Sequence, residues 1–191
     1  TLIDLNRAGV ALLEIVSEPD IRSGEEAYQY VTEVRKLVRY LDICDGNMEE
    51  GSMRCDANVS VRLKGAKEFG KRTETKNMNS IRNVQRAIEF EIKRQIDVIE
   101  SGGEISQDTM GFDAVAGTTY LMRSKEMAND YRYFPEPDLQ PVVVSKEYIE
   151  KVKKELPPLP NELFKKYTTL GLSEYDAGVL TDSKEIALYF E

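Results

Sequence analysis

The sequence contains no histidine among its 191 residues. This absence removes serine–histidine and cysteine–histidine nucleophile pairs, and also histidine metal ligands, from this stretch of protein. The chemistry that remains is that of carboxylates, lysine, arginine and a hard cation such as Mg²⁺, which prefers oxygen ligands.

Cysteine is scarce. Cys44 and Cys55 are the only two, and they do not form a C-x-x-C pair, so by themselves they cannot build a zinc site. Cys55 is one of the apolar residues in a segment where apolar and polar residues alternate, and a buried free thiol is usual at such a position. This cysteine usage fits a reducing, cytoplasmic location.

Long apolar runs and a signal peptide are also missing, so the sequence predicts no membrane span. The 34 acidic and 26 basic residues give a net charge of −8. Because attraction to phosphate dominates nucleic-acid binding, a nucleic-acid partner would need a local basic strip or another domain. The chain starts at Thr1 in what resembles the approach to a strand and stops at Glu191 without a C-terminal cap. We therefore expect it to be a piece of a longer protein.

From Ser52 to Arg62, apolar and polar residues alternate without interruption. This period of two is typical of a strand with one side on a core. We interpret the other side as the lining of a polar cleft, because it carries a guanidinium, a carboxylate, an amide and hydroxyls in a row. The alternative is an ordinary solvent-facing strand with a surface ion pair. The apolar side holds Met53, Cys55, Ala57, Val59 and Val61, and the polar side holds Ser52, Arg54, Asp56, Asn58, Ser60 and Arg62.

Residues 10–20 suggest another strand, with apolar residues at both odd and even positions and Glu14 in the middle. That pattern predicts a strand covered on both faces. Burying an unpaired carboxylate costs several kcal/mol. Glu14 is then either a metal-binding or catalytic carboxylate or the partner of a buried arginine, for which Arg7 and Arg54 are candidates.

Two amphipathic helices are indicated. The S-x-x-E pattern of Ser23–Glu26 matches a capping box and begins a helix that continues to Leu41. The second helix begins near Ser80, runs to Ile99 and ends at Gly102–Gly103. Each has a single apolar stripe, which suits packing on one face of a sheet.

Shorter strands flank the second helix. Thr73–Met78 precedes it, and Ile105–Phe112 and Thr118–Arg123 follow it as a hairpin around Ala116–Gly117. The order of elements favours an α+β domain with a mostly antiparallel sheet and amphipathic helices on one face.

Residues 130–138 form a segment with two prolines, and Pro141 follows shortly after. Proline holds the backbone extended. Three aromatic residues and Arg132 suit stacking on a base or clamping a phosphate. A loop whose rings merely pack on the sheet would have the same composition, so both interpretations stay open.

A short helix from Lys146 to Leu156 is followed by the break Pro157-Pro158-Leu159-Pro160. We therefore divide the chain into residues 1–156 and residues 157–191. The second part has helix starts at Ser173 and Ser183, and we interpret it as the start of a helical domain.

Three motifs, at residues 13–20, 48–58 and 130–138, closely resemble the family of B subunits of aspartyl/glutamyl-tRNA amidotransferases. The likeness extends over essentially the whole chain, as a central fragment of such a protein. It implies a partial catalytic domain similar in fold to glutamine synthetase. It also implies that further metal ligands, including a histidine, and a tRNA-holding tail domain lie outside this chain, so that the chain alone should be inactive.

The resemblance implies a two-step amidation in a cytoplasmic heterotrimer. ATP and Mg²⁺ would serve to phosphorylate the side-chain carboxylate of Glu misacylated onto tRNA-Gln, or of Asp misacylated onto tRNA-Asn. Ammonia released from glutamine by the amidase (A) subunit would then displace phosphate, and a small C subunit completes the assembly. Phosphoryl transfer mainly needs positioning and charge neutralisation, which suits the residue types present here.

Glu14 matches a family metal-ligand position. Glu49 and Glu50 are candidates for binding metal or for steering ammonium, and Arg54 and Arg132 for binding phosphate or carboxylate. The polar face of the alternating strand and its neighbour adds three weaker candidates. They are Asp56 for metal, and Lys76 and Asn58 for the nucleotide.

The rival hypothesis is a non-catalytic module that only presents misacylated tRNA to the amidase. Glu14 would then be an ion-pair partner and the polar strand an interface. A carboxylate ligase of the ATP-grasp kind would demand a glycine-rich phosphate loop, and the sequence has none.

Overall fold

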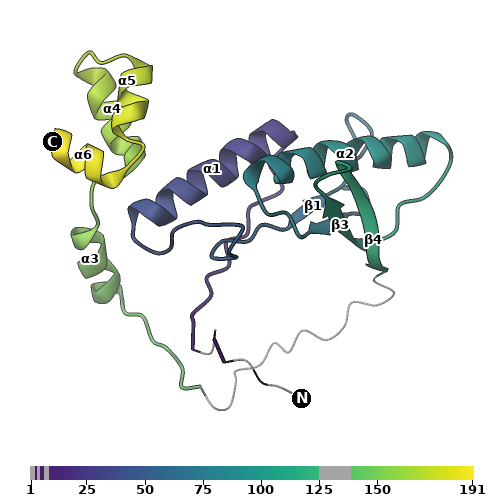
Figure 1. Ribbon diagram of the computed structural model, residues 1–191, viewed down its shortest axis with the longest axis horizontal. Coiled ribbons are helices and arrows are strands. Elements are labelled where there is room, and N and C mark those ends of the chain that lie inside the picture. Colours follow the sequence, from purple (N-terminus) through teal and green to yellow (C-terminus); the bar gives the residue numbers. More distant parts are fainter. Residues whose placement is uncertain (1–2, 4, 7–8, 125–138) are drawn as a thin grey trace.

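The structure is a computed structural model that describes residues 3, 5–6, 9–124 and 139–191. Among these residues, two long helices and four strands come first along the chain, and four shorter helices follow (Figure 1). The long helices and the strands are α1 (Gly24–Tyr40), β1 (Ala57–Val59), β2 (Thr73–Lys76), α2 (Ile81–Glu100), β3 (Asp108–Asp113) and β4 (Thr118–Ser124). The shorter helices are α3 (Lys146–Glu155), α4 (Pro160–Thr169), α5 (Glu174–Leu180) and α6 (Lys184–Phe190).

The four strands form one sheet in the order β1-β2-β3-β4. β1 pairs with β2, and β3 with β4, in antiparallel fashion, whereas β2 and β3 are parallel. The parallel pairing follows from α2, because a helix between two neighbouring strands returns the chain to the end from which it came. The sheet of the described residues is therefore mixed, where the sequence predicted a mostly antiparallel one.

The helix boundaries follow the predicted capping residues. The Ser23 hydroxyl accepts a hydrogen bond from the Glu26 amide, and the Ser80 hydroxyl accepts one from the Asn83 amide. Beyond α2, Gly102 adopts a φ of +82°, the left-handed conformation that ends helices. Serine caps also begin three shorter helices, at Ser145, Ser173 and Ser183.

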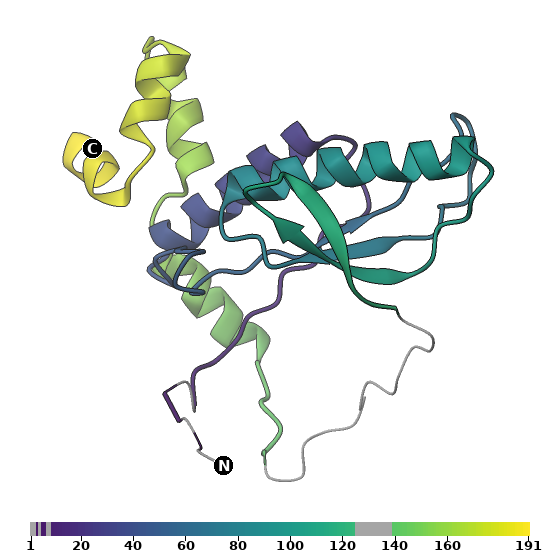
Figure 2. The same ribbon diagram turned by 45° about the vertical axis from the view of Figure 1, so that its right-hand side comes forward.

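One face of the sheet is covered by α2, and α1 packs beside α2 (Figures 1 and 2). The expected placement on one face of the sheet is confirmed for α2, whereas α1 makes its main contact with α2 and not with the strands. The core between α2 and the sheet is small and apolar. Its buried members are Ala57, Val59, Met78, Val84, Ala87 and Phe112.

The predicted strand over residues 10–20 is wrong for the described structure. These residues form no strand, and their large apolar side chains are exposed, including Leu12 at 93% and Val16 at 80%. No strand of the described part lies alongside to accept their backbone hydrogen bonds, so the apolar pattern has no sheet to join. Glu14 is accordingly an exposed side chain and not a buried one.

The C-terminal helices α4–α6 lie beyond the end of α1, away from the sheet (Figures 1 and 2). Tyr40, the last residue of α1, is buried among them together with Leu163, Tyr167, Ala177 and Ala187. An ion pair between Lys184 and Asp42 supports the same contact. None of the described helices has the length and apolar character needed to cross a membrane.

Candidate functional site on the open face of the sheet

The alternation predicted around β1 is confirmed by burial. Arg54, Asp56 and Asn58 are exposed, whereas Ala57 and Val59 are buried under α2. The strand itself is shorter than the pattern. We call the side of the sheet opposite α2 the open face, defined by Asp56, Asn58, Glu74, Lys76 and Tyr120.

Two cross-strand rows organise the open face. In one row Asn58 is paired with Glu74, and Glu74 with Thr109. In the other row Lys76 is paired with Gly111, and Gly111 with Tyr120. Paired residues on one face of a sheet have neighbouring side chains. The register therefore gathers the predicted residues Asp56, Asn58 and Lys76 on one surface.

The Lys76 ammonium lies between two carboxylates. Its Nζ is 2.5 Å from Asp56 Oδ2 and 3.1 Å from Glu74 Oε1. The hydrogen bond to Asp56 raises the pKa of Lys76, and the bond to Glu74 raises it further, so the lysine stays charged. Two carboxylates and one ammonium leave this cluster with a net charge of −1. Such a cluster favours hydroxyl or amino donors and cations over a bare phosphate.

The covered face carries a different polar cluster, which we call the α2 network: Glu91, Arg94, Gln95, Thr73 and Thr119. Glu91 is fully buried, and its Oε1 accepts a 2.8 Å hydrogen bond from the Thr73 hydroxyl. Its Oε2 accepts hydrogen bonds from Arg94 Nε at 3.0 Å and from the Thr119 hydroxyl at 3.0 Å. Through these bonds α2 holds both β2 and β4.

Gln95 extends the α2 network to β1. Its Nε2 donates to the Val59 carbonyl at 3.0 Å and to the Thr73 hydroxyl at 3.0 Å. Burial by itself would raise the pKa of Glu91, but hydrogen bonds from Arg94, Gln95 and Thr73 outweigh it and hold the pKa below its usual value. The carboxylate is therefore ionised and saturated by partners, which is the signature of a structural group.

Glu49 and Glu50 lie in a turn organised by Asn47. The Asn47 side-chain oxygen accepts hydrogen bonds from the backbone amides of Glu49 at 2.9 Å and of Glu50 at 3.3 Å. Asp45 accepts a hydrogen bond from the Asn47 amide, which is the main reason that the pKa of Asp45 is lowered. The turn therefore leaves the carboxylate side chains of Glu49 and Glu50 at an exposed surface.

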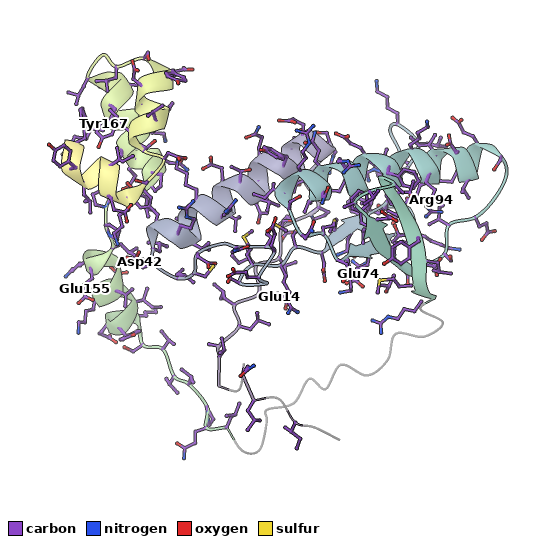
Figure 3. All side chains as sticks on the ribbon, viewed as in Figure 1. Glu14, Asp42, Glu74, Arg94, Glu155 and Tyr167 are labelled. Carbon is purple, nitrogen blue, oxygen red and sulfur yellow. The ribbon has the colours of Figure 1, made fainter. Side chains whose placement is uncertain are left out.

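Two further predicted residues are Glu14 and Arg132. Glu14 lies on the segment that precedes α1, whereas Glu74 lies on the sheet (Figure 3). Arg132, and Arg7 as a suggested partner of Glu14, lie outside the described residues. Within the part of the chain that the structure describes, no three carboxylate or thiol side chains gather as a metal site would require. The assignments of Glu14 and Asp56 as metal ligands therefore stay predictions.

Cys55 is an inert member of this region. Burial, and after it the nearby Asp56 carboxylate, raise the pKa of its thiol to about 11. A thiol with that pKa is almost wholly protonated at neutral pH, so a nucleophilic role is unsuited to it.

Sequence reasoning missed Glu74, Tyr120 and Glu91. Glu74 has a signal, because it alternates with the buried Thr73 and Thr75 as Lys76 does. Glu91 also has one, because it lies four residues before Gln95 on the apolar stripe of α2. The sequence around Tyr120 carries no signal of this kind, because the position of Tyr120 depends on its pairing with Gly111 on the neighbouring strand.

Residues 1–150 match the sequence model of the GatB/GatE catalytic domain. Across the whole chain, 59% of residues are identical to the B subunit of the aspartyl/glutamyl-tRNA(Asn/Gln) amidotransferase of a Wolbachia strain from Drosophila simulans, of which 41% is covered. The protein of the same name from Chlorobium limicola is 58% identical over the whole chain, with 40% of it covered. The chain thus spans about two fifths of the length of these curated relatives.

Proposed function

The chain belongs to the GatB/GatE catalytic domain family, and from this premise we propose that it forms part of the B subunit of a tRNA-dependent amidotransferase. The observation that carries the proposal is identity of 56–59% over almost the whole chain with proteins that all bear this name. The reaction class is a carbon–nitrogen ligation. Its substrates are Glu attached to tRNA-Gln, Asp attached to tRNA-Asn, or both.

We propose that the reaction consumes ATP. A carboxylate is a poor acyl donor because its leaving group would be oxide, whereas an acyl phosphate releases phosphate. The phosphoryl group would pass from ATP to the side-chain carboxylate of the misacylated amino acid. Ammonia would then attack the acyl carbon, phosphate would leave, and the surplus proton of the attacking nitrogen would pass to a base.

Magnesium, when bound, neutralises charge on the phosphoryl oxygens. Glu14 and Asp56 are the proposed ligands in this chain, and both present exposed carboxylates. Asp56 is partly neutralised by Lys76, so it would hold a cation less strongly than a lone carboxylate. We propose that Arg54 and Arg132 bind the anionic oxygens of phosphate or carboxylate. Glu49 and Glu50 would steer ammonium and accept its surplus proton.

The net charge of −8 gives this chain little general attraction for RNA. We therefore propose that tRNA is held mainly by other parts of the assembly, in a complex with an amidase (A) subunit and a small C subunit. Asn58 of the open face would contact the nucleotide directly. Lys76 would act on it indirectly, by positioning the carboxylates of Asp56 and Glu74.

The test is Glu14→Ala in the complete B subunit, assembled with its partners. Glu14 is exposed and outside regular structure, so its removal should leave the unfolding midpoint unchanged. We expect amide formation on misacylated tRNA to fall at least 100-fold, while glutamine hydrolysis by the amidase continues. Glu150→Ala, which removes an exposed carboxylate from α3, is the matched control and should retain activity.

Amide formation at the normal rate by the Glu14→Ala enzyme would refute the metal role. Amide formation without any ATP consumption would refute the proposed acyl phosphate. It would also leave the tRNA-presenting module as the better description of this chain.

A further inference from the structure

The ring of Tyr120 reaches over a glycine on the open face. A Cβ atom built on Gly111 would lie 2.4 Å from Tyr120 Cζ and 2.6 Å from its hydroxyl oxygen. No side chain larger than hydrogen therefore fits at position 111 while the ring stays in place. Gly111 itself is buried, whereas Tyr120 remains 49% exposed. The ring therefore rests against the sheet backbone at Gly111, while part of Tyr120 stays accessible.

The ring points along the row that contains Lys76. Tyr120 is paired with Gly111, and Gly111 with Lys76 on the next strand, at roughly 5 Å per strand. Beyond the ring lie the carboxylates of Asp56 and Glu74, both bound to Lys76. The open face thus presents a flat aromatic surface beside two fixed hydrogen-bond acceptors.

This combination suits one chemical class of ligand. Aromatic side chains stack on nucleobases, and carboxylates accept hydrogen bonds from ribose hydroxyls. We propose that Tyr120, seated on Gly111, is the platform on which the purine base of the nucleotide stacks, with Glu74 accepting hydrogen bonds from the ribose hydroxyls of the nucleotide. The inference rests on the proposed ATP-dependent function and adds the place where the base binds.

The charge of this surface favours a free nucleotide over an RNA strand. An RNA strand carries a phosphate at every nucleotide and would bring these phosphates close to the carboxylates of Asp56 and Glu74. The cluster that these carboxylates form with Lys76 has a net charge of −1, so it would repel them. A free nucleotide has a single chain of phosphates at one end, and the magnesium ion proposed beside Asp56 would offset their charge.

The experiment measures KM for ATP and KM for misacylated tRNA in the complete amidotransferase carrying variants of this chain. Tyr120→Leu should raise KM for ATP roughly tenfold, with kcat and KM for tRNA little changed. Tyr120→Phe keeps the ring and should behave like the wild type. Gly111→Ala should resemble Tyr120→Leu, because its methyl group displaces the ring.

Tyr175→Leu is the matched control, because Tyr175 is 79% exposed on α5, and it should change neither KM. An unchanged KM for ATP in Tyr120→Leu would overturn the inference and leave the proposed function standing. A rise in KM for tRNA alone would also overturn it, since RNA would then be the occupant. A wild-type enzyme that consumes no ATP would overturn the proposed function and this inference together.

Discussion

The two faces of the small sheet use polar residues in opposite ways. On the face under α2, Thr73 and Gln95 are buried and bound to Glu91. On the open face, Lys76 and Asp56 also pair, but their side chains remain 31% and 44% exposed. Thr73 and Lys76 belong to the same strand, β2, and differ in what covers them.

The comparison separates structural from functional polarity. A buried carboxylate whose partners are all supplied by the protein has little capacity left for a ligand, and its loss should affect folding. An exposed cluster costs little to rearrange and keeps hydrogen-bonding capacity for a ligand. Variants on the covered face should therefore lower stability first, and variants on the open face should lower activity first.

The largest effect on stability is expected from Glu91→Gln. The substitution removes the charge that balances Arg94 and breaks a saturated cluster. Arg94 keeps access to solvent, with 31% of its side chain exposed, which limits the cost. We expect a loss of about 2–3 kcal/mol in the free energy of unfolding, measured by urea denaturation.

The pH dependence sharpens this prediction. Glu91 has a lowered pKa in the folded protein, so the unfolded state binds its proton first. Its stabilisation is fully present above the ordinary value of 4.5 and is lost as the pH falls through the folded pKa. Glu91→Gln should therefore flatten the fall in stability below pH 4.5. A variant as acid-sensitive as the wild type would show that Glu91 contributes nothing.

A smaller effect is expected from Thr73→Val. The hydroxyl of Thr73 donates to Glu91 and accepts from Gln95, so its removal leaves both partners short of a hydrogen bond in the core. We expect a loss of about 1–2 kcal/mol in the free energy of unfolding. The thermal midpoint should fall correspondingly, and an unchanged midpoint would contradict the structural role.

Thr75→Val is the matched control, with the smallest effect and the opposite sign. Thr75 is fully buried on the same face, but its hydroxyl has no hydrogen-bond partner among the described residues. Replacing an unsatisfied hydroxyl by a methyl group should raise the free energy of unfolding by up to about 1 kcal/mol. Destabilisation equal to that of Thr73→Val would mean that the two threonines are alike.

Local signals in the sequence predicted most of the elements. Ser23 and Ser80 cap the two long helices as expected, because capping depends on residues within one turn. The hairpin β3–β4 also depends on its own turn at Gly117, which has a φ of +71°. The direction of β2 relative to β3 was not predictable from either strand alone, because α2 determines it.

Long-range packing decided what the sequence could not predict. Apolar residues at 10–16 have the pattern of a buried strand, yet a strand forms only where a neighbour supplies hydrogen bonds, and the described residues supply none. The polar alternation of Asp56 and Asn58 did predict the open face. Tyr120 was missed because its role depends on Gly111 across the sheet.

The central claim is that the open face serves the reaction while the covered face holds the fold. The most direct measurement is the rate of ATP-dependent amide formation by the complete enzyme carrying Lys76→Met, with its unfolding midpoint measured alongside. We predict a fall in rate of at least tenfold with a loss of stability below about 1 kcal/mol, because the two carboxylates lose the charge that positions them. A normal rate, or a loss of activity that follows unfolding, would contradict the claim.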